Sequence, residues 1–457
     1  MARQVHGIGP DPHAASGLRV AAAYARGVRV LPELLGTQFL PRGVVRELAR
    51  RRFARIVAHA KAHSPFYRAH FARIDPSRAA PADVPLLDKA SLRDRGPELI
   101  CEGVDRRRLL ERSSSGSSGV PTRIAFDPLR ELPRRVQELR LLTAHGMRPS
   151  DRQLVFDHPG HQTDKQFTLQ KVGLWRRMPY PWQLPIEEGV RFIEGERPEI
   201  LHGVLSSLRL LAIAVGDRAL SYAPRLLVSK GELLDPATRG LCERVLRAKL
   251  VDYYATEEAG ILAWQAPDAD GYWIDEDLVL LETIDPDTGR PTARGEPGEI
   301  VVTNLYMRSM PIIRYRTGDL GVIEDEPRGA SRGLPLLREL RGRKMDCILT
   351  PEGEVHHPFA LLGVMEESEE LAGFRIRQEA IDRLVVALAV RQGTSADRRR
   401  ALEDRIRAAM RARLGASMQV AIEELGDARP GVGEKFPLVQ GLPSATLREL
   451  MGKHARL

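Results

Sequence analysis

The chain is predicted to fold as an α/β protein, with a large N-terminal domain of several α/β layers and a small C-terminal α+β domain. Three observations support this prediction. The 457 residues exceed the length that one hydrophobic core usually serves, so at least two domains are expected. Helical patterns alternate with short apolar runs over residues 129–250, which is typical of α/β layers. Strand-like patterns follow from residue 299, and a smaller mixed unit follows residue 343.

The elements of the first half can be placed in order from their spacing. Apolar residues recur at helical spacing over 44–62, and Pro65 ends that predicted helix. A polar, proline-rich connection over 75–85 then leads into a Ser/Gly-rich loop. In the alternating region, the short apolar runs 153–156 and 225–228 are expected to be strands.

The second half is richer in strand patterns. Strands are predicted at 299–303, 311–315, 384–390 and 418–422. The second of these is expected to run into a turn at 317–319. A helical stripe closed by Gly415 completes a compact unit of about one hundred residues, near the usual domain size. We place the boundary near Asp346, which gives domains 1–345 and 346–457.

Composition and charge restrict the class of function. The net charge is +8 and comes almost wholly from arginine, spread along the chain without regular aromatic interleaving, so no nucleic-acid partner is expected. No apolar run reaches membrane-spanning length, and the N-terminus lacks a signal-peptide pattern. The cysteines Cys101, Cys242 and Cys347 make no metal-ligand spacing and favour a reducing, cytoplasmic location.

The Ser/Gly-rich loop at 111–122 is the most informative motif. It holds five serines and two glycines and is followed by a strand-like run. Glycines let the backbone curl so that its N–H groups face an anion, and serines add further donors. The expected ligand is a polyphosphate. The loop is not a Walker motif, because no Gly-Lys-Ser/Thr closes it and no helix follows. On its own it could equally be a flexible linker.

Five more short motifs follow this loop in the chain. They are Ser229-Lys230-Gly231-Glu232, Asp252-Tyr253-Tyr254-Ala255-Thr256-Glu257-Glu258, Tyr315-Arg316-Thr317-Gly318-Asp319, Gly342-Arg343-Lys344-Met345-Asp346 and Gly431-Val432-Gly433-Glu434-Lys435. Each has an ordinary structural explanation, such as an exposed carboxylate, a core aromatic residue or a tight turn. None of those explanations accounts for the order of all six.

In this order the motifs resemble the adenylate-forming superfamily of acyl-CoA synthetases and peptide-synthetase adenylation domains. Within it, the chain is similar to the phenylacetate-CoA ligase and capsule-biosynthesis-like branch, because residues 64–68 and 85–93 look like the opening of that branch. Thr122 also fits it, where the wider superfamily usually has lysine. The resemblance covers most of residues 45–440. It implies a large domain of the adenylate-forming type and a small, mobile C-terminal domain.

The resemblance implies a site for ATP and Mg²⁺. It assigns the β- and γ-phosphates to the loop residues Ser114, Ser115, Gly116, Ser117, Ser118 and Gly119. Thr256 matches the phosphate-contacting hydroxyl, and Glu257 matches the magnesium ligand. A hard cation takes oxygen ligands and keeps several waters, so one carboxylate is sufficient.

The adenosine half of ATP is assigned to the middle motifs. Gly231 and Glu232 match the adenine-side segment, and Tyr253 matches the ring that stacks on adenine. Asp319 matches the carboxylate that accepts hydrogen bonds from the ribose diol, with Arg343 beside it.

The reaction implied is attack of a carboxylate on the α-phosphate of ATP, which requires stabilisation of added negative charge. Lys435 matches the mobile lysine that bridges ribose, α-phosphate and acyl carboxylate, and Asp346 matches the hinge. The expected function is activation of a small carboxylic acid to an acyl-adenylate, followed by transfer to coenzyme A. An amine or carrier-protein acceptor is the alternative, and a non-catalytic nucleotide-binding protein is a third. The retained Lys435 and Glu257 argue against the third.

Two positions depart from the superfamily pattern. Tyr254 stands where glycine is usual, and Leu233 follows Gly231-Glu232 where proline is common. Neither touches the phosphate chemistry, but both leave the acid unspecified. His158 and His161 could face a substrate, but a structural role is at least as well supported, so neither is included in the site.

Overall fold

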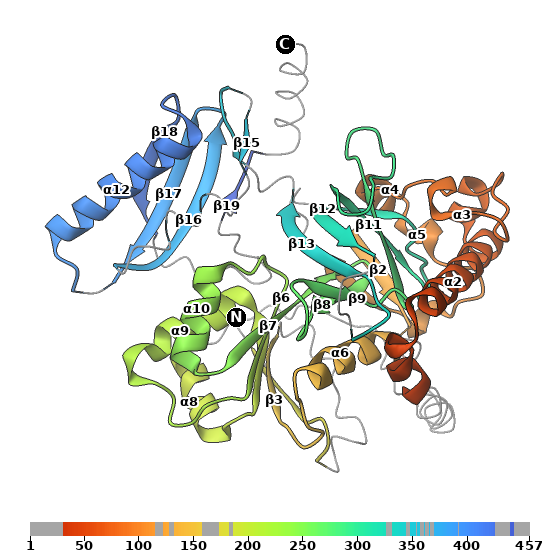
Figure 1. The fold of residues 1–457 in the computed structure, drawn as a ribbon, viewed down its shortest axis with the longest axis horizontal. Helices are drawn as coiled ribbons and strands as arrows, with labels where there is room; N and C mark the ends of the chain where they lie inside the picture. The colour runs from red at the N-terminus through yellow and green to blue at the C-terminus, as the bar shows by residue number, and fades with distance from the viewer. Residues whose placement is uncertain are drawn as a thin grey trace, which may run out of the picture.

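Figure 1 shows the computed structural model of the chain. The structure describes residues 31–114, 122–127, 132–157, 173–181, 186–325, 331–343, 348–352, 354–356, 361, 365, 370–391, 393–425 and 439–442. In this part of the chain, no helix is both long and apolar enough to cross a membrane.

An eleven-stranded mixed sheet forms the centre of the large domain, and five of its strands are parallel. In sheet order these are β4 (Arg177–Pro181), β3 (Gln153–Asp157), β5 (Ile200–Val204), β6 (Leu226–Lys230) and β7 (Lys249–Thr256). The strands predicted at 153–156 and 225–228 correspond to β3 and β6. Parallel neighbours need long crossovers, which the intervening helices supply.

The other six strands continue the sheet from β7 in antiparallel order. They are β8 (Gly260–Gln265), β9 (Tyr272–Ile274), β13 (Leu336–Arg343), β12 (Tyr315–Glu324), β11 (Pro297–Asn304) and β10 (Val279–Ile284). The strand predicted at 299–303 lies within β11. The one predicted at 311–315 is wrong except for Tyr315, because β12 begins there and continues through the expected turn at 317–319. Gly318 adopts a left-handed φ of 78° inside β12, which glycine allows without strain.

Helices cover both faces of the parallel part. One face packs against α8 (Ile186–Glu196), α9 (Leu205–Val215) and α10 (Pro236–Leu246), and the other against α6 (Leu132–Ala144). Since both faces are covered, the strands between them read as nearly continuous apolar runs rather than alternating ones. Figure 1 shows these helices around β3, β6 and β7.

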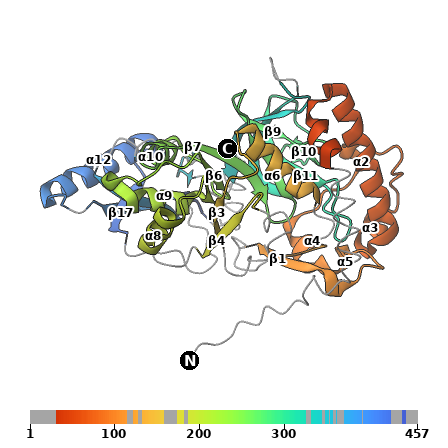
Figure 2. The ribbon, with the colours of Figure 1, turned by 90° about the horizontal axis from the view of Figure 1, so that it is seen from below.

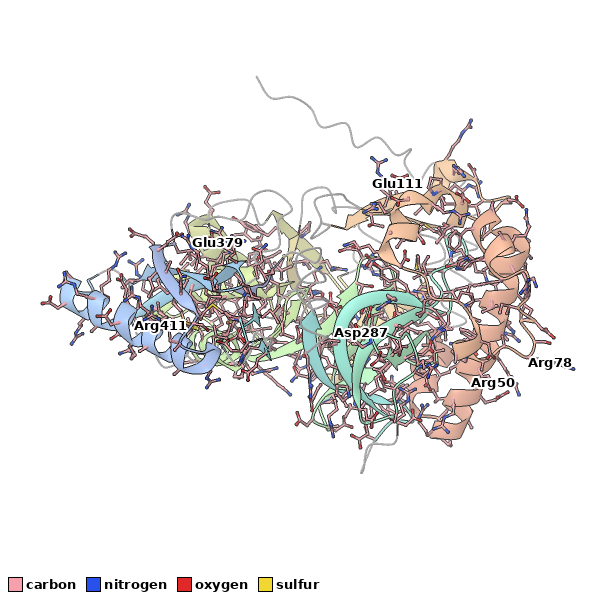
Figure 3. All side chains as sticks on the ribbon, turned by 90° about the horizontal axis from the view of Figure 1, so that it is seen from above. Arg50, Arg78, Glu111, Asp287, Glu379 and Arg411 are labelled. Carbon is pink, nitrogen blue, oxygen red and sulfur yellow. The ribbon has the colours of Figure 1, made fainter. Side chains whose placement is uncertain are left out.

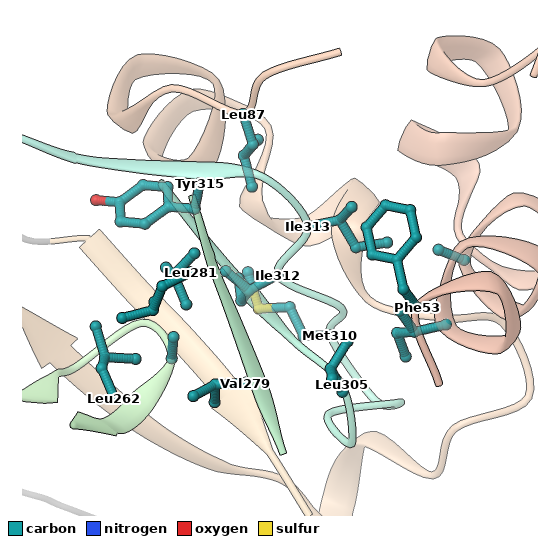
Figure 4. Close-up of a cluster of buried hydrophobic side chains, with 14 of the residues drawn as sticks. Phe53, Leu87, Leu262, Val279, Leu281, Leu305, Met310, Ile312, Ile313 and Tyr315 are labelled. Atoms are coloured by element: carbon teal, nitrogen blue, oxygen red, sulfur yellow. The ribbon is translucent and has the colours of Figure 1, made fainter. Parts of the chain in front are cut away.

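The N-terminal helices pack over the antiparallel part of the sheet. They are α2 (Arg42–His63), α3 (Pro65–His70), α4 (Lys89–Asp94) and α5 (Gly96–Leu99), with single 3₁₀ turns at Thr37–Phe39, Pro81–Asp83, Arg106–Arg108 and Gly216–Arg218 elsewhere in the large domain. The predicted helix at 44–62 is α2. Phe53 of this helix reaches the apolar core that Figure 4 shows, together with Leu87, Met310 and Tyr315.

A buried ion network ties the start of this region to the sheet. The guanidinium group of Arg140, on α6, lies 2.7 Å from Oδ1 of Asp275 and 2.8 Å from Oδ1 of Asp277. Thr37 also contacts Asp277, its hydroxyl donating to Oδ2 at 2.7 Å. All three charged side chains are fully buried, so each depends on its partners for compensation of its lost hydration.

The C-terminal unit has its own sheet and core. Its elements are β14 (Ile348–Leu349), β15 (Val355–His356), β16 (Leu371–Ala380), β17 (Arg383–Val390), α12 (Ala396–Leu414), β18 (Gln419–Glu424) and β19 (Val439–Gln440). The four-stranded sheet has the order β18-β17-β16-β19. The helix α12 ends before Gly415, as the sequence indicates, and Gly415 has a φ of 97°. The described core side chains of this unit all come from Ile348 onward.

The two ends of the molecule carry many exposed arginines. Figure 2 places α12 and α2 at opposite ends of the fold. Arg411 on α12 and Arg50 on α2 are exposed, and Figure 3 shows both at the surface.

The predicted fold class is confirmed as α/β with a large N-terminal domain and a smaller C-terminal domain. The boundary proposed at 345/346 lies outside the described residues.

Candidate active site

The carboxyl ends of β6 and β7 bring two of the predicted motifs together. The two strands are parallel, and Lys230 pairs with Tyr253, so Gly231 and Glu232 begin beside Tyr253. Gly231 has a φ of 78°, a left-handed conformation that suits glycine. The crevice beyond the carboxyl ends of parallel strands is a common ligand position in open α/β sheets.

Tyr253 lies against the sheet with little exposed surface. It is 6% exposed, and its hydroxyl lies 3.1 Å from Nε2 of His202, on β5. The two rings meet edge to face, with centroids 5.7 Å apart. Burial raises the pKa of Tyr253 above its ordinary value, so the phenol keeps its proton at neutral pH. Its predicted role of stacking on adenine remains a prediction.

A charged cluster behind Tyr253 was not predicted. Glu138 of α6 lies 3.9 Å from Nδ1 of His202 and 3.5 Å from the guanidinium group of Arg177 on β4. Burial acts to raise the pKa of Glu138, but Arg177 and Arg135 lower it to about 2, so the group is ionised. One signal for it is visible in the sequence, because the polar His202 lies inside an otherwise apolar strand.

The motif that contains Asp319 reaches the other face of β7. The hydroxyl of Tyr254 donates to Oδ2 of Asp319 at 2.6 Å, and both residues are only 8% exposed. Asp319 on β12 is paired in register with Arg343 on β13. The backbone thus places Arg343 beside Asp319, as expected, although the side chain of Arg343 lies outside the described part.

Thr256 is the last residue of β7, and Glu257 begins the turn that follows it. The hydroxyl of Thr256 accepts a hydrogen bond from the backbone N–H of Ala259 at 3.1 Å and so fixes the turn. Glu257 lines a small surface hollow together with Ile124 and Phe126. These two belong to β2 (Thr122–Phe126), the strand that follows the Ser/Gly loop. The predicted metal ligand therefore lies beside the strand that follows the predicted phosphate loop.

The strands on either side of the Ser/Gly loop pair with each other. The strand β1 (Leu110–Ser114) pairs with β2 in antiparallel order, and Ser114 is opposite Thr122. The expectation of a strand after the loop is confirmed. Residues Ser115, Gly116, Ser117, Ser118 and Gly119 lie outside the described part of the chain.

Four further predicted or considered positions also fall outside it. These are Lys435, the hinge residue Asp346, and the histidines His158 and His161. The structure therefore neither supports nor contradicts the roles proposed for them.

The donor types present fit a magnesium ion bound with ATP. Within the described ranges, no group of three or more His, Cys, Asp or Glu side chains could hold a metal alone. Mg²⁺ is usually bound through one or two carboxylates, substrate phosphates and waters, not an all-protein cage. Glu257 supplies a carboxylate of this kind next to β2.

A buried carboxylate beside the candidate nucleotide position is a second unpredicted feature. Asp252 accepts hydrogen bonds from Ser229 at 2.5 Å and from the hydroxyl of Tyr272 at 3.0 Å. Burial raises the pKa of Asp252 to about 7. At neutral pH this group is therefore close to its midpoint of ionisation.

Known proteins with similar sequences are ligases. No family model matches the chain. The phenylacetate-coenzyme A ligase of Thermus thermophilus is 28% identical over 348 residues, which cover 70% of this chain and 74% of that protein. The phenylacetate-coenzyme A ligase of Pseudomonas putida is 25% identical over 314 residues, which cover 64% of this chain and 69% of that protein.

A solved structure shares the fold over almost the whole chain. It is 2-hydroxyisobutyryl-CoA ligase in the postadenylation state in complex with R3-HIB-AMP, with a TM-score of 0.74 and 18% identity over 92% of this chain and 94% of that chain. The same ligase with 2-HIB-AMP and CoA in the thioesterification state gives a TM-score of 0.60 at 19% identity, with the same coverage.

The order of the motifs, the fold and the similar proteins all point to the same class of enzyme. In sequence and in fold, the chain is similar to adenylate-forming enzymes of the phenylacetate-CoA ligase-like branch. The expected enzyme class, an AMP-forming carboxylate ligase, is confirmed at this level. The similarity to capsule-biosynthesis proteins is not tested by these comparisons.

Within this adenylate-forming enzyme, β7 is the element on which the predicted site converges. Tyr253 lies beside Gly231, Tyr254 contacts Asp319, and Glu257 faces β2. The sequence places these residues in separate motifs, and the sheet determines which face of β7 each motif meets.

Proposed function

We propose that this enzyme uses ATP to activate a small carboxylic acid as an acyl-adenylate, with release of pyrophosphate, and then transfers the acyl group to coenzyme A. The observation that carries the proposal is the convergence on β7 of Gly231, Tyr253, Asp319 and Glu257, which the resemblance assigns to adenine, ribose and magnesium. The names of the relatives support coenzyme A as the acceptor.

Each half of the site has a distinct task in this proposal. The loop from Ser114 to Gly119 holds the β- and γ-phosphates with backbone N–H groups and hydroxyls, while Thr256 contacts a phosphate oxygen. A magnesium ion held by Glu257 would neutralise part of the negative charge of the phosphates. Asp319 holds the ribose, with Arg343 beside it.

The acyl carboxylate attacks the α-phosphorus, the bond to the bridging oxygen breaks, and pyrophosphate leaves. The proposed role of Lys435 is to stabilise the negative charge that grows on the α-phosphate in this step. In the second step the thiol sulfur of coenzyme A bonds to the acyl carbon, its proton is lost, and AMP leaves. The small domain would turn about Asp346 between the two steps.

Acid-dependent exchange of pyrophosphate into ATP tests the first step. A panel of aryl, aliphatic and amino acids should contain at least one acid that supports exchange, and AMP release with that acid should rise when coenzyme A is added. If exchange occurs but AMP release rises with an amine or a carrier protein and not with coenzyme A, that amine or carrier protein would be the acceptor instead. ATP binding with no exchange for any acid would reject the proposed function.

A cytoplasmic location and the absence of a nucleic-acid partner remain predictions from the sequence.

A further inference from the structure

The contact between Tyr254 and Asp319 is a feature of the candidate site that the family pattern does not explain. The distance of 2.6 Å between the phenol oxygen and Oδ2 is typical of a strong hydrogen bond to a charged acceptor. Tyr254 stands at the position where the superfamily usually has glycine. The contact is therefore made by a side chain that the usual glycine could not supply.

We propose that Tyr254 is a specificity-determining residue of the nucleotide site. Its hydroxyl holds one oxygen of the carboxylate that binds the ribose, so the two ribose hydroxyls contribute unequally to ATP binding. This inference rests on the proposed function, because it requires Asp319 to bind ribose.

The position of Tyr254 makes the contact hard to displace. Tyr254 belongs to the main apolar core of the large domain, and its backbone is paired with Ala263 on β8. Because the residue is 8% exposed, its hydroxyl has little access to water as an alternative partner. A buried donor that loses its acceptor is destabilising, so the contact should persist when a nucleotide enters.

A ribose diol bound by both oxygens of a carboxylate donates one hydrogen bond to each. With Tyr254 already donating to Oδ2, the ribose hydroxyl on that side must share its acceptor. The other hydroxyl does not compete with Tyr254. Removal of one ribose hydroxyl should therefore weaken nucleotide binding much more than removal of the other.

Calorimetric binding of ATP, 2′-deoxy-ATP and 3′-deoxy-ATP to the full-length chain tests this. For the wild type, one analogue should bind within about twofold of ATP and the other about tenfold more weakly, the size of effect expected for one hydrogen bond to a charged group. In Tyr254→Phe, both analogues should bind about tenfold more weakly than ATP.

The matched control is Tyr315→Phe. Tyr315 is also buried, and its hydroxyl donates to a different carboxylate, that of Glu258, at 3.0 Å. This variant should keep the wild-type ratios. A second variant, Asp319→Asn, should weaken the discrimination against the analogue that the wild type binds poorly.

Equal ratios in the wild type and Tyr254→Phe would overturn the inference, as would full discrimination in Asp319→Asn. ATP binding without acid-dependent exchange would reject the proposed function. The affinities of the two analogues relative to ATP would still test the role of Tyr254. If the wild type bound no ATP, both proposals would fail.

Discussion

At the scale of single residues, neighbouring side chains on β7 have unlike environments. Tyr253 contacts His202 on the α6 side, whereas Asp252 and Tyr254 face the opposite side and contact Tyr272 and Asp319. Successive side chains of a strand point to opposite faces, so adjacent residues in one motif serve different parts of the site. The roles of such residues are best tested one at a time.

The Glu257→Gln variant should need more magnesium. The substitution removes an anionic oxygen from a hard-cation site, so the Mg²⁺ concentration for half-maximal exchange should rise by about tenfold or more. Binding of adenosine should change little. The neighbouring Glu258→Gln is the control, because Glu258 instead accepts a hydrogen bond from Tyr315. Unchanged magnesium dependence in Glu257→Gln would remove this residue from the site.

The ionisation of Asp252 should make stability depend on pH. Burial raises its pKa from 3.8 to about 7. Between these values the folded protein holds a proton that the unfolded chain has released, so this contribution to stability falls as pH rises through the window and is lost above about pH 7. A tenfold change in proton affinity corresponds to about 1.4 kcal/mol, so the total effect is several kcal/mol at most.

Melting temperatures at pH 5 and pH 8 check this expectation. Asp252→Asn has no group to ionise, so its melting temperature should fall less between these pH values than that of the wild type. Asp270→Asn, at an exposed position between β8 and β9, is the control and should follow the wild type. A parallel pH response in Asp252→Asn would show that Asp252 does not titrate in this range.

At the scale of elements, polar contacts between distant segments fix the arrangement of the large domain. Arg140 on α6 joins the segment at Thr37 to the residues after β9 through Asp275 and Asp277. These contacts span more than one hundred positions in the chain, so local patterns could not predict them. The sequence shows an arginine on an amphipathic helix, which is usually exposed to solvent.

Arg140→Met should be strongly destabilising. It leaves two buried carboxylates without their main counter-charge, a loss of about 3–5 kcal/mol. The same change at Arg50, whose exposed partner is Glu47, should destabilise the protein far less, because solvent screens a surface ion pair. Thermal unfolding of the two variants, each against the wild type, provides the comparison. Equal shifts would mean that the buried network contributes no more than a surface ion pair.

At the scale of the whole molecule, the proposed reaction needs two arrangements of one site. Lys435 must enter to stabilise adenylation, yet the acceptor must later reach the same acyl carbon. The small domain has a separate core, so it can turn as a body without breaking its own packing. Its proposed boundary at 345/346 includes Asp346, which we propose as the hinge.

Substitutions at the hinge and at the lysine should separate the two half-reactions. Asp346→Pro fixes φ near about −65° and should spare adenylate formation while it blocks transfer to the acceptor, if the hinge is held in the adenylating arrangement. Lys435→Ala should do the opposite and still transfer the acyl group from a supplied acyl-adenylate. Equal losses in both half-reactions for both folded variants would contradict the two-arrangement proposal.

The sequence by itself determined the α/β class, the helix α2, two of the five strands of the parallel part and the order of the six motifs. These depend on local periodicity and on spacing, which a single chain displays directly. It failed at the turn expected over 317–319, because β12 continues through Gly318, which is accommodated inside the strand with a left-handed φ. A glycine-containing turn pattern does not reveal whether neighbouring strands continue to pair through it.

Only the tertiary structure decided which motif residues meet. The partners of Tyr253, Tyr254 and Asp252 come from strands and helices far away in the chain, and the face of β7 decides which partner each one has. The raised pKa of Asp252 and the buried charges of Arg140 likewise follow from burial. Burial depends on long-range packing, and for that reason no local pattern of residues displays it.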